Sequence, residues 1–264
     1  GLGDKAAFVN ENDIIPFEDV YDCMKDVMSD ILLGRELPRG IVGWYYQQFL
    51  KMKYAALCKD EYYMSWDGDT VPCKVFSMFD GEGKPYFDMK HEYHEEYFIT
   101  LESLLPDVRK NVEKSFISEH MIFNSTYMNE LITTIESNMD IKGVTFWEKI
   151  LYSIRIKHIQ ENSFSEFETY GTYMTARHPD VYNFRNWNSF RYGGYYFHPD
   201  LMTERDYEWM GRDFYAISFE KSHFVREDHE NLFNNPRYQN KLTARQMVEI
   251  TQEVSEGYNE VWDD

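Results

Sequence analysis

The sequence predicts an α/β protein with a largely parallel sheet, and three observations support this prediction. Short apolar runs typical of strands alternate with stretches of helical periodicity through most of the 264 residues. Hydrophobic residues make up 43% of the chain, enough for a substantial core. No internal repeat or low-complexity linker is present. We therefore expect one domain over residues 1–229 and a helical C-terminal tail over residues 230–264 that packs on it.

Each expected element follows from its local pattern. Apolar side chains at three- and four-residue spacing lie on one face of a helix, and short aromatic or β-branched runs favour strands. Proline and glycine clusters favour loops. In chain order we expect a weak strand at 6–10, a helix at 17–33, a loop at 38–43, a helix at 44–56, strands at 62–66, 75–79 and 86–89, a helix at 98–105, a strand at 116–123, helices at 127–137 and 145–156, and a strand at 214–219.

The composition limits the classes of partner. The formal net charge is −19, so general electrostatics would repel a nucleic-acid backbone and anionic lipid alike. An acidic protein that binds an anionic ligand is expected to do so through a metal ion. Aromatic residues make up 17% of the chain, and tyrosine is the most frequent of them, which suggests a wet, amphipathic cleft or interface.

The cysteines and the hydropathy pattern bear on location. Cys23, Cys58 and Cys73 are scattered, odd in number and without Cys-x-x-Cys spacing, which argues against a disulfide framework or a zinc site. No apolar run is long enough to predict a transmembrane segment. We therefore expect a cytoplasmic protein that reaches the inner face of the membrane, if at all, through other domains or partners.

The segment 62–72 joins an aromatic strand to a pair of carboxylates. Asp67 and Asp69 flank Gly68 directly after the strand. Because strand residues alternate faces, we expect both carboxylates to point the same way. Gly68 allows a sharp turn or the close approach of a ligand. A divalent cation between the carboxylates would relieve their repulsion, and oxygen ligands suit Mg²⁺ or Mn²⁺, whereas the simpler alternative is a solvated acidic turn.

Three blocks in order, Gly43–Lys51, Tyr62–Asp69 and Phe164–Tyr173, resemble glycosyltransferases of the GT-A fold, and in particular a family of bacterial-type polysaccharide glycosyltransferases. The resemblance implies a Rossmann-related, mostly parallel sheet flanked by helices. It also implies that the Asp-x-Asp motif holds Mn²⁺ or Mg²⁺ and, through it, the diphosphate of a nucleotide-sugar, with a UDP-sugar favoured. The expected reaction moves the sugar to a saccharide or glycoconjugate acceptor during polysaccharide assembly.

The resemblance also suggests donor-binding residues. A late histidine often completes the metal site of this fold, and His223, just after the strand 214–219, is the best-placed candidate to join Asp67 and Asp69. Contacts to the nucleotide-sugar are expected from the Asp67, Gly68 and Asp69 motif together with Trp44, Tyr45, Gln48 and His120.

An inverting transferase needs a carboxylate that removes the proton of the acceptor hydroxyl. Glu166, Glu168 and Glu119 are the candidates for this general base. Glu166 and Glu168 would share a face in an extended segment and diverge on a helix.

Two other functions compete with this interpretation. The run from Asp67 to Val71 also fits the first motif of haloacid-dehalogenase-type phosphatases, in which Asp67 would be the nucleophile. Pro72 and the lack of a later lysine with paired aspartates weigh against it. A non-catalytic saccharide- or protein-binding domain is the third alternative.

The resemblance further implies an N-terminal strand–helix–strand unit. The sequence shows only one weak strand there, so we expect this unit to be missing from the sequence or abbreviated.

Overall fold

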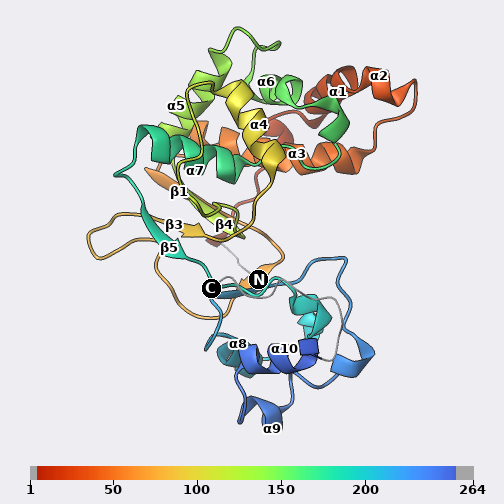
Figure 1. Ribbon diagram of the computed structural model, residues 1–264, viewed down its shortest axis with the longest axis vertical. Coiled ribbons are helices and arrows are strands. Elements are labelled where there is room, and N and C mark those ends of the chain that lie inside the picture. Colours follow the sequence, from red (N-terminus) through yellow and green to blue (C-terminus); the bar gives the residue numbers. More distant parts are fainter. Residues whose placement is uncertain (1–4, 254–264) are drawn as a thin grey trace. The chain divides into compact units, whose positions relative to one another are not determined.

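The computed structural model of the protein describes residues 5–253 and divides into two compact units (Figure 1). Within the described residues, the first unit is drawn from Gly1–Ser65, Glu92–Ile117 and Met121–Asn183. The second unit is drawn from Trp66–His91, Ser118–His120 and Phe184–Asp264. Residues of the predicted domain 1–229 therefore contribute to both units. The sequence contains no linker between them because each unit is assembled from segments that are distant along the chain.

Helices form most of the first unit, and polar side chains mark where several of them begin. Asn124 accepts hydrogen bonds from the free N–H groups of α5, Thr145 forms a capping box with Glu148 at α6, and Ser165 caps α7. The helices are α1 (Phe17–Val27), α2 (Ser29–Leu32), α3 (Arg39–Lys53), α4 (Glu95–Leu104), α5 (Ser125–Glu136), α6 (Phe146–Ser153) and α7 (Glu166–Arg177), with shorter 3-10 turns at Glu11–Asp13, Tyr54–Ala56 and Ile156–His158.

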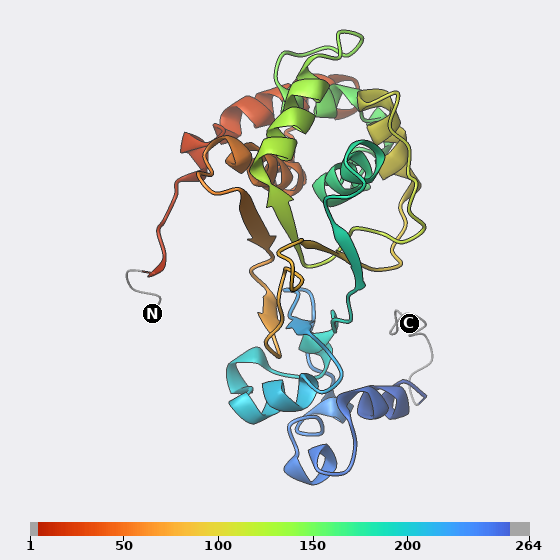
Figure 2. The ribbon, with the colours of Figure 1, turned by 90° about the vertical axis from the view of Figure 1, so that its left-hand side faces the viewer.

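The core of the first unit lies among these helices. Helix α7 contacts α3, α4 and α5, while α1 packs against α3 and α6 (Figure 2). The Phe49 ring lies 6.1 Å from that of Phe146 and 6.2 Å from that of Phe164, measured between centroids. Strand β1 (Tyr62–Trp66) pairs with β4 (His120–Asn124) in a two-stranded sheet. The unit is therefore a helical layer with a small sheet.

The second unit has short strands and an aromatic core. Strand β2 (Thr70–Pro72) pairs antiparallel with β6 (Ala216–Ser218), and β3 (Tyr86–Met89) pairs with β5 (Asn183–Asn186). The remaining elements are α8 (Glu204–Met210), α9 (Pro236–Gln239), α10 (Ala244–Glu253) and 3-10 turns at Gly193–Tyr195, Pro199–Leu201 and Glu227–His229. Buried side chains from these elements and from the segments between them form one cluster that includes Trp209, Phe214, Phe233, Met247 and Val248. Helix α10, in the predicted tail, thus contributes to this core.

The protein is a mixed α/β protein, as the sequence predicts. Most expected elements form close to their predicted positions. Among the described residues, however, the strands pair two by two, and β2 and β6 run antiparallel. The larger, mostly parallel sheet therefore stays a prediction.

Three local predictions are wrong. Residues 6–10 and 75–79 form no strand; they include highly exposed side chains, with Phe8 94% and Val75 100% exposed, and a strand needs a partner for its backbone groups. The expected loop at 38–43 is mostly helix, because Pro38 lies at the N-cap of α3 and Gly40 and Gly43 are accommodated within it.

Two further sequence predictions can be compared with the described residues. No helix of residues 5–253 has the length and apolarity needed to cross a membrane. Cys23, Cys58 and Cys73 are all free thiols, in agreement with the absence of a disulfide framework.

Candidate functional site

The two aspartates of the motif lie in a turn that follows β1, which we call the Asp67–Asp69 turn. The Asp67 N–H donates a hydrogen bond to the Glu119 carbonyl over 2.9 Å, and the Phe219 N–H donates to the Asp69 carbonyl over 2.8 Å. Within the turn, the Thr70 N–H donates to the Asp67 carbonyl over 3.1 Å. Because two distant segments hold its backbone, the chain itself determines the conformation of this turn.

Side chains reinforce the turn from its buried side. The Trp66 indole N–H donates to the Thr70 carbonyl over 2.8 Å. The Thr70 hydroxyl lies 2.7 Å from that of Ser218, on the neighbouring strand β6, and 3.3 Å from Oδ1 of Asp69. Asp69 is exposed and Asp67 is half-buried. The backbone is therefore fixed from within, while Asp69 is exposed and Asp67 keeps part of its surface exposed.

The geometry of the turn differs from the sequence expectation in one respect. Strand β1 ends at Trp66, so the alternation of strand faces does not determine the directions of Asp67 and Asp69. Gly68 has no positive φ, and nothing lies within 4 Å of the position that a Cβ would occupy. The fold of the turn therefore does not require glycine at position 68. The other role predicted for Gly68, the close approach of a ligand to the backbone, stays a prediction.

A buried ion pair lies directly behind the turn. The Lys90 ammonium contacts Oε1 of Glu119 at 2.6 Å, and the Ser189 hydroxyl and the Trp187 indole N–H donate to the same carboxylate over 2.7 and 2.9 Å. Burial raises the pKa of Glu119, but the Lys90 charge and these hydrogen bonds outweigh it and lower the pKa from 4.5 to about 2. Glu119 is therefore a stable carboxylate and a weak base.

A second buried charge cluster contains His120. Its Nε2 lies 2.8 Å from Oδ2 of Asp88, and because a carboxylate can only accept, Nε2 carries the proton. Arg185 binds both oxygens of Asp88, from Nε over 2.6 Å and from Nη2 over 2.7 Å. His120 is 1% exposed, and its Nδ1 has no hydrogen-bond partner. Its predicted contact with a nucleotide-sugar stays a prediction, since the ring is covered in this structure.

His223 follows the strand that holds the turn. Asp69 accepts from Phe219, and His223 lies four residues further on, with its ring stacked on that of Tyr195 at 4.1 Å between centroids. Its Nε2 is 3.6 Å from Oε2 of Glu220, whose Oε1 is 3.6 Å from Arg191. Among residues 5–253, no three or more His, Cys, Asp or Glu side chains are arranged as a metal site. The role of His223 as third metal ligand is therefore still a prediction.

The other two candidate bases, Glu166 and Glu168, lie in the first turn of α7, in the first unit. Because this segment is helical, their side chains diverge, as expected for that case. Glu166 pairs with the Lys51 ammonium at 2.9 Å, and the Glu166 backbone N–H donates to the side-chain oxygen of Gln48 over 3.0 Å. Both glutamates are buried.

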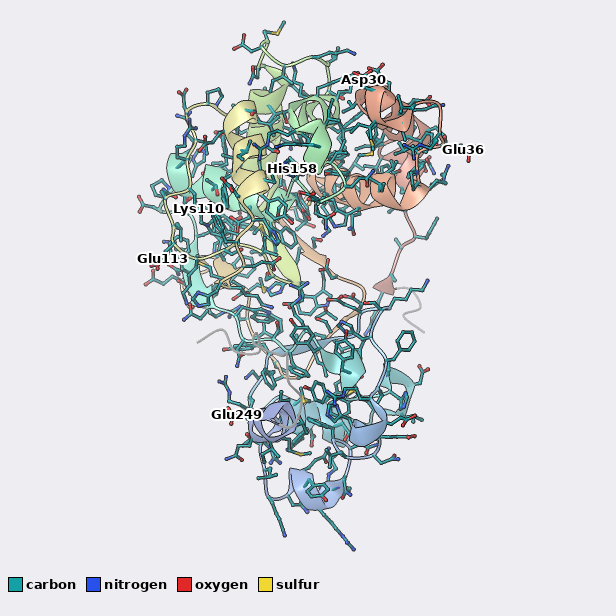
Figure 3. All side chains as sticks on the ribbon, turned by 45° about the vertical axis from the view of Figure 1, so that its right-hand side comes forward. Asp30, Glu36, Lys110, Glu113, His158 and Glu249 are labelled. Carbon is teal, nitrogen blue, oxygen red and sulfur yellow. The ribbon has the colours of Figure 1, made fainter. Side chains whose placement is uncertain are left out.

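Glu168 has a different set of partners. Its Oε1 accepts from the Ser115 hydroxyl over 2.5 Å and from the Phe116 N–H over 3.0 Å. Its Oε2 accepts no hydrogen bond and lies 3.6 Å from the ammonium of Lys110, a residue labelled in Figure 3. Burial raises the pKa of Glu168 above its ordinary value, although these partners favour the carboxylate.

Three predicted donor-binding residues, on α3, also belong to the first unit. The Tyr45 hydroxyl donates to the Ile159 carbonyl over 2.8 Å and accepts from the Ser163 N–H over 3.1 Å. Gln48 is occupied by Glu166 and by the Trp44 carbonyl. Tyr45 and Gln48 are buried, and Trp44 is half-buried. Their observed contacts hold the helices together, and their contact with a nucleotide-sugar stays a prediction.

Sequence reasoning missed the charged residues that support the turn. Lys90, Asp88 and Arg185 were not singled out, because their partners lie between 29 and 97 positions away and no local spacing links them. Their one sequence signal is position, since Asp88 and Lys90 lie in and directly after a short, otherwise apolar strand, β3.

The comparisons with known proteins identify the family. Residues 5–249 match the family described as "Family of unknown function (DUF6492)". No curated protein and no solved structure matches the chain. Because the match extends over most of the sequence, the protein belongs to the DUF6492 family.

Proposed function

We propose that the protein is a metal-dependent glycosyltransferase that binds the diphosphate of a nucleotide-sugar at the Asp67–Asp69 turn. The observation that carries the proposal is the turn itself, in which an exposed and a half-buried aspartate lie on a backbone held by Glu119 and Phe219. The GT-A-like fold implied by the sequence resemblance, and transfer to a saccharide or glycoconjugate acceptor, belong to the same proposal.

The residues present suit Mg²⁺ or Mn²⁺ shared with a ligand. Mg²⁺ is commonly bound by one or two protein carboxylates together with substrate phosphates and water. Asp67 and Asp69 provide such a pair. Asp67 and Asp69 would hold the cation, whose positive charge would offset the negative charge of the leaving diphosphate.

The chain's own residues then have separate tasks. Asp67 and Asp69 would bind the diphosphate end of the donor through the cation, and the bonds from Trp66 to Thr70 and from Thr70 to Ser218 hold Thr70, which closes the turn, in place. Glu119 supports the turn through its carbonyl, and its low pKa makes it a poor choice as general base. Glu166 and Glu168 stay predictions for that role.

Binding of nucleoside diphosphates tests the proposal. Titration calorimetry with UDP, GDP, CDP and dTDP, each with and without Mn²⁺, should show metal-dependent binding of at least one nucleotide. Asp67→Asn and Asp69→Asn should each weaken that binding by about 100-fold or more, since each removes an anionic ligand. Asp80→Asn is the matched control, because Asp80 also shapes a turn of the second unit through bonds from the Glu82 and Lys84 N–H groups.

Other outcomes favour other functions. Hydrolysis of a phosphate monoester that disappears in Asp67→Asn would identify the phosphatase alternative, in which Asp67 is the nucleophile. Metal-independent binding of an oligosaccharide, with no nucleotide bound, would favour the non-catalytic domain.

A further inference from the structure

The residue directly before the Asp67–Asp69 turn is stacked on a buried histidine. The rings of Trp66 and His120 have centroids 4.8 Å apart and planes inclined by 25°. The indole N–H of Trp66 donates a hydrogen bond to the Thr70 carbonyl over 2.8 Å. Trp66 therefore connects His120 on one side to the closing residue of the turn on the other.

His120 itself has little freedom to move. Its Nε2 is bound to Asp88, and both oxygens of Asp88 are bound by Arg185. The ring also meets the edge of Trp187 at 4.4 Å between centroids, with the planes inclined by 68°. The Phe76 ring is a third aromatic neighbour, at 6.1 Å between centroids, so one hydrogen bond and three aromatic rings restrict the orientation of His120.

The neighbouring residue adds a second link to the same turn. The Glu119 carbonyl accepts from the Asp67 N–H, and the Glu119 carboxylate is held by Lys90, Ser189 and Trp187. Trp187 thus contacts both residues, donating to Glu119 and packing against His120. Residues 119 and 120 therefore form a single fixed support under both ends of the turn.

We propose that His120 is a positioning residue that sets the geometry of the Asp67–Asp69 turn through the Trp66 ring. The effect of His120 on ligand binding rests on the proposed function, whereas its effect on the geometry of the turn does not. His120 acts through Trp66 and touches no ligand, which agrees with its burial and with the engagement of Nε2 by Asp88.

Hydrogen exchange at single amides tests the structural part without any ligand. His120→Gln keeps a side-chain N–H for Asp88 and removes the aromatic ring. The Asp67 and Thr70 amides should then exchange about three- to tenfold faster, the change expected when a hydrogen bond of ordinary net strength is weakened. The Tyr215 amide, bound to the Asn188 carbonyl over 2.8 Å in the same unit, should keep its rate relative to the wild type.

His229→Gln is the matched control. His229 is also buried in the second unit and stacks on Tyr196 at 4.7 Å between centroids. Loss of this ring should leave the Asp67 and Thr70 amides unchanged. Equal acceleration in both variants, or no acceleration in His120→Gln, would overturn the proposal.

A milder variant covers the case in which His120→Gln does not fold. Trp66→Phe keeps an aromatic ring against His120 and removes the indole donor to Thr70. It should accelerate exchange at the Thr70 amide with little loss of stability, and an unchanged Thr70 amide would contradict the role given to Trp66.

Affinity separates the two proposals. If the wild type binds a nucleoside diphosphate with Mn²⁺, His120→Gln should weaken that binding about tenfold and His229→Gln should not; equal affinities in the wild type and His120→Gln would overturn the positioning role. If the wild type binds no nucleotide, the proposed function fails, and the exchange rates alone decide the role of His120.

Discussion

Two pairs of acidic residues have the same spacing in this protein and opposite environments. Asp67 and Asp69 lie in a turn of the second unit, where Asp69 is exposed and Asp67 is half-buried. Glu166 and Glu168 lie in the first turn of α7 in the first unit, and both are buried. Each glutamate has a lysine beside it, Lys51 for Glu166 and Lys110 for Glu168.

The difference in burial between the two acidic pairs distinguishes carboxylates that belong to the core from carboxylates proposed to bind a ligand. A carboxylate in the first turn of a helix interacts favourably with the helix dipole, and a lysine offsets the cost of burying it. Glu166, paired with Lys51 at 2.9 Å, therefore contributes to the fold, whereas burial outweighs the partners of Glu168 and raises its pKa. The aspartates receive support for their backbone, and Asp69 is exposed, which suits the proposed cation-binding site. Spacing alone does not distinguish the two cases.

The largest expected contrast is in stability. Glu166→Gln leaves the Lys51 ammonium, whose side chain is only 20% exposed, without its carboxylate. We expect the free energy of unfolding to fall by roughly 3 kcal/mol, near the lower end for a broken buried pair because Lys51 keeps some solvent contact. Asp69→Asn, the same chemical change at the exposed pair, should change it by less than about 0.5 kcal/mol.

Urea denaturation of both variants measures this contrast. Replacing Lys51 and Glu166 together by Met and Leu should recover much of the loss, because no unpaired charge is left in the interior. Equal losses for Glu166→Gln and Asp69→Asn would mean that the buried pair has no special part in the fold.

Buried glutamates of the two units should also respond to pH in opposite directions. Glu119 has a folded-state pKa of about 2 against an ordinary value of 4.5, so its contribution, on the order of 3 kcal/mol, is complete above pH 4.5 and is lost as the pH falls through 2. Glu168 has a raised pKa in the folded state, so it lowers stability as the pH rises above 4.5.

Unfolding measured between pH 3 and pH 8 tests both signs. The stability difference between wild type and Glu119→Gln should be largest at neutral pH and shrink on acidification. The stability of Glu168→Gln relative to the wild type should increase as the pH rises, because the wild type alone carries the buried charge. Parallel pH profiles for the two variants would contradict the assigned directions.

The smallest contrast concerns two glycines. A Cβ at Gly171, on α7, would lie 2.3 Å from the nearest ring atom of Phe116, so Gly171→Ala should cost about 1–3 kcal/mol through overpacking. At Gly68 the corresponding space is open and φ is not positive, so Gly68→Ala should leave stability within about 0.5 kcal/mol.

Gly68→Ala also sharpens the proposal for the turn. Because the fold does not require glycine there, a loss of nucleotide affinity with unchanged thermal stability would indicate that a ligand approaches the backbone closely. Unchanged nucleotide affinity would mean that Gly68 takes no part in binding, and that only the two aspartates of the motif do.

The elements best predicted from the sequence are those whose periodicity matches their burial. Helix α5 and strand β1 lie where the apolar pattern places them. The errors at 6–10 and 75–79 have a common cause. Both runs have the residue types of a strand, but pairing in the second run is limited to its end, where Phe79 forms a single bridge with Pro85, and neither run forms a strand.

The candidate site was predictable in part for the same reason. The Asp67–Asp69 motif is local, and a strand of aromatic residues precedes it. Its supports are not local: Glu119 and Ser218 come from segments about 50 and 150 residues further along the chain. The clusters of Lys90 with Glu119 and of Asp88 with His120 and Arg185 appear only when these segments meet.

By itself the sequence determined the α/β class, the positions of most helices, and the paired aspartates after β1, because these depend on periodicity and residue type within short windows. Only the tertiary structure decided which acidic pair is buried and which is open, and it revealed the buried ion network behind the turn. The physical reason is that the free energy of a charge depends on its burial and partners, and distant segments supply both.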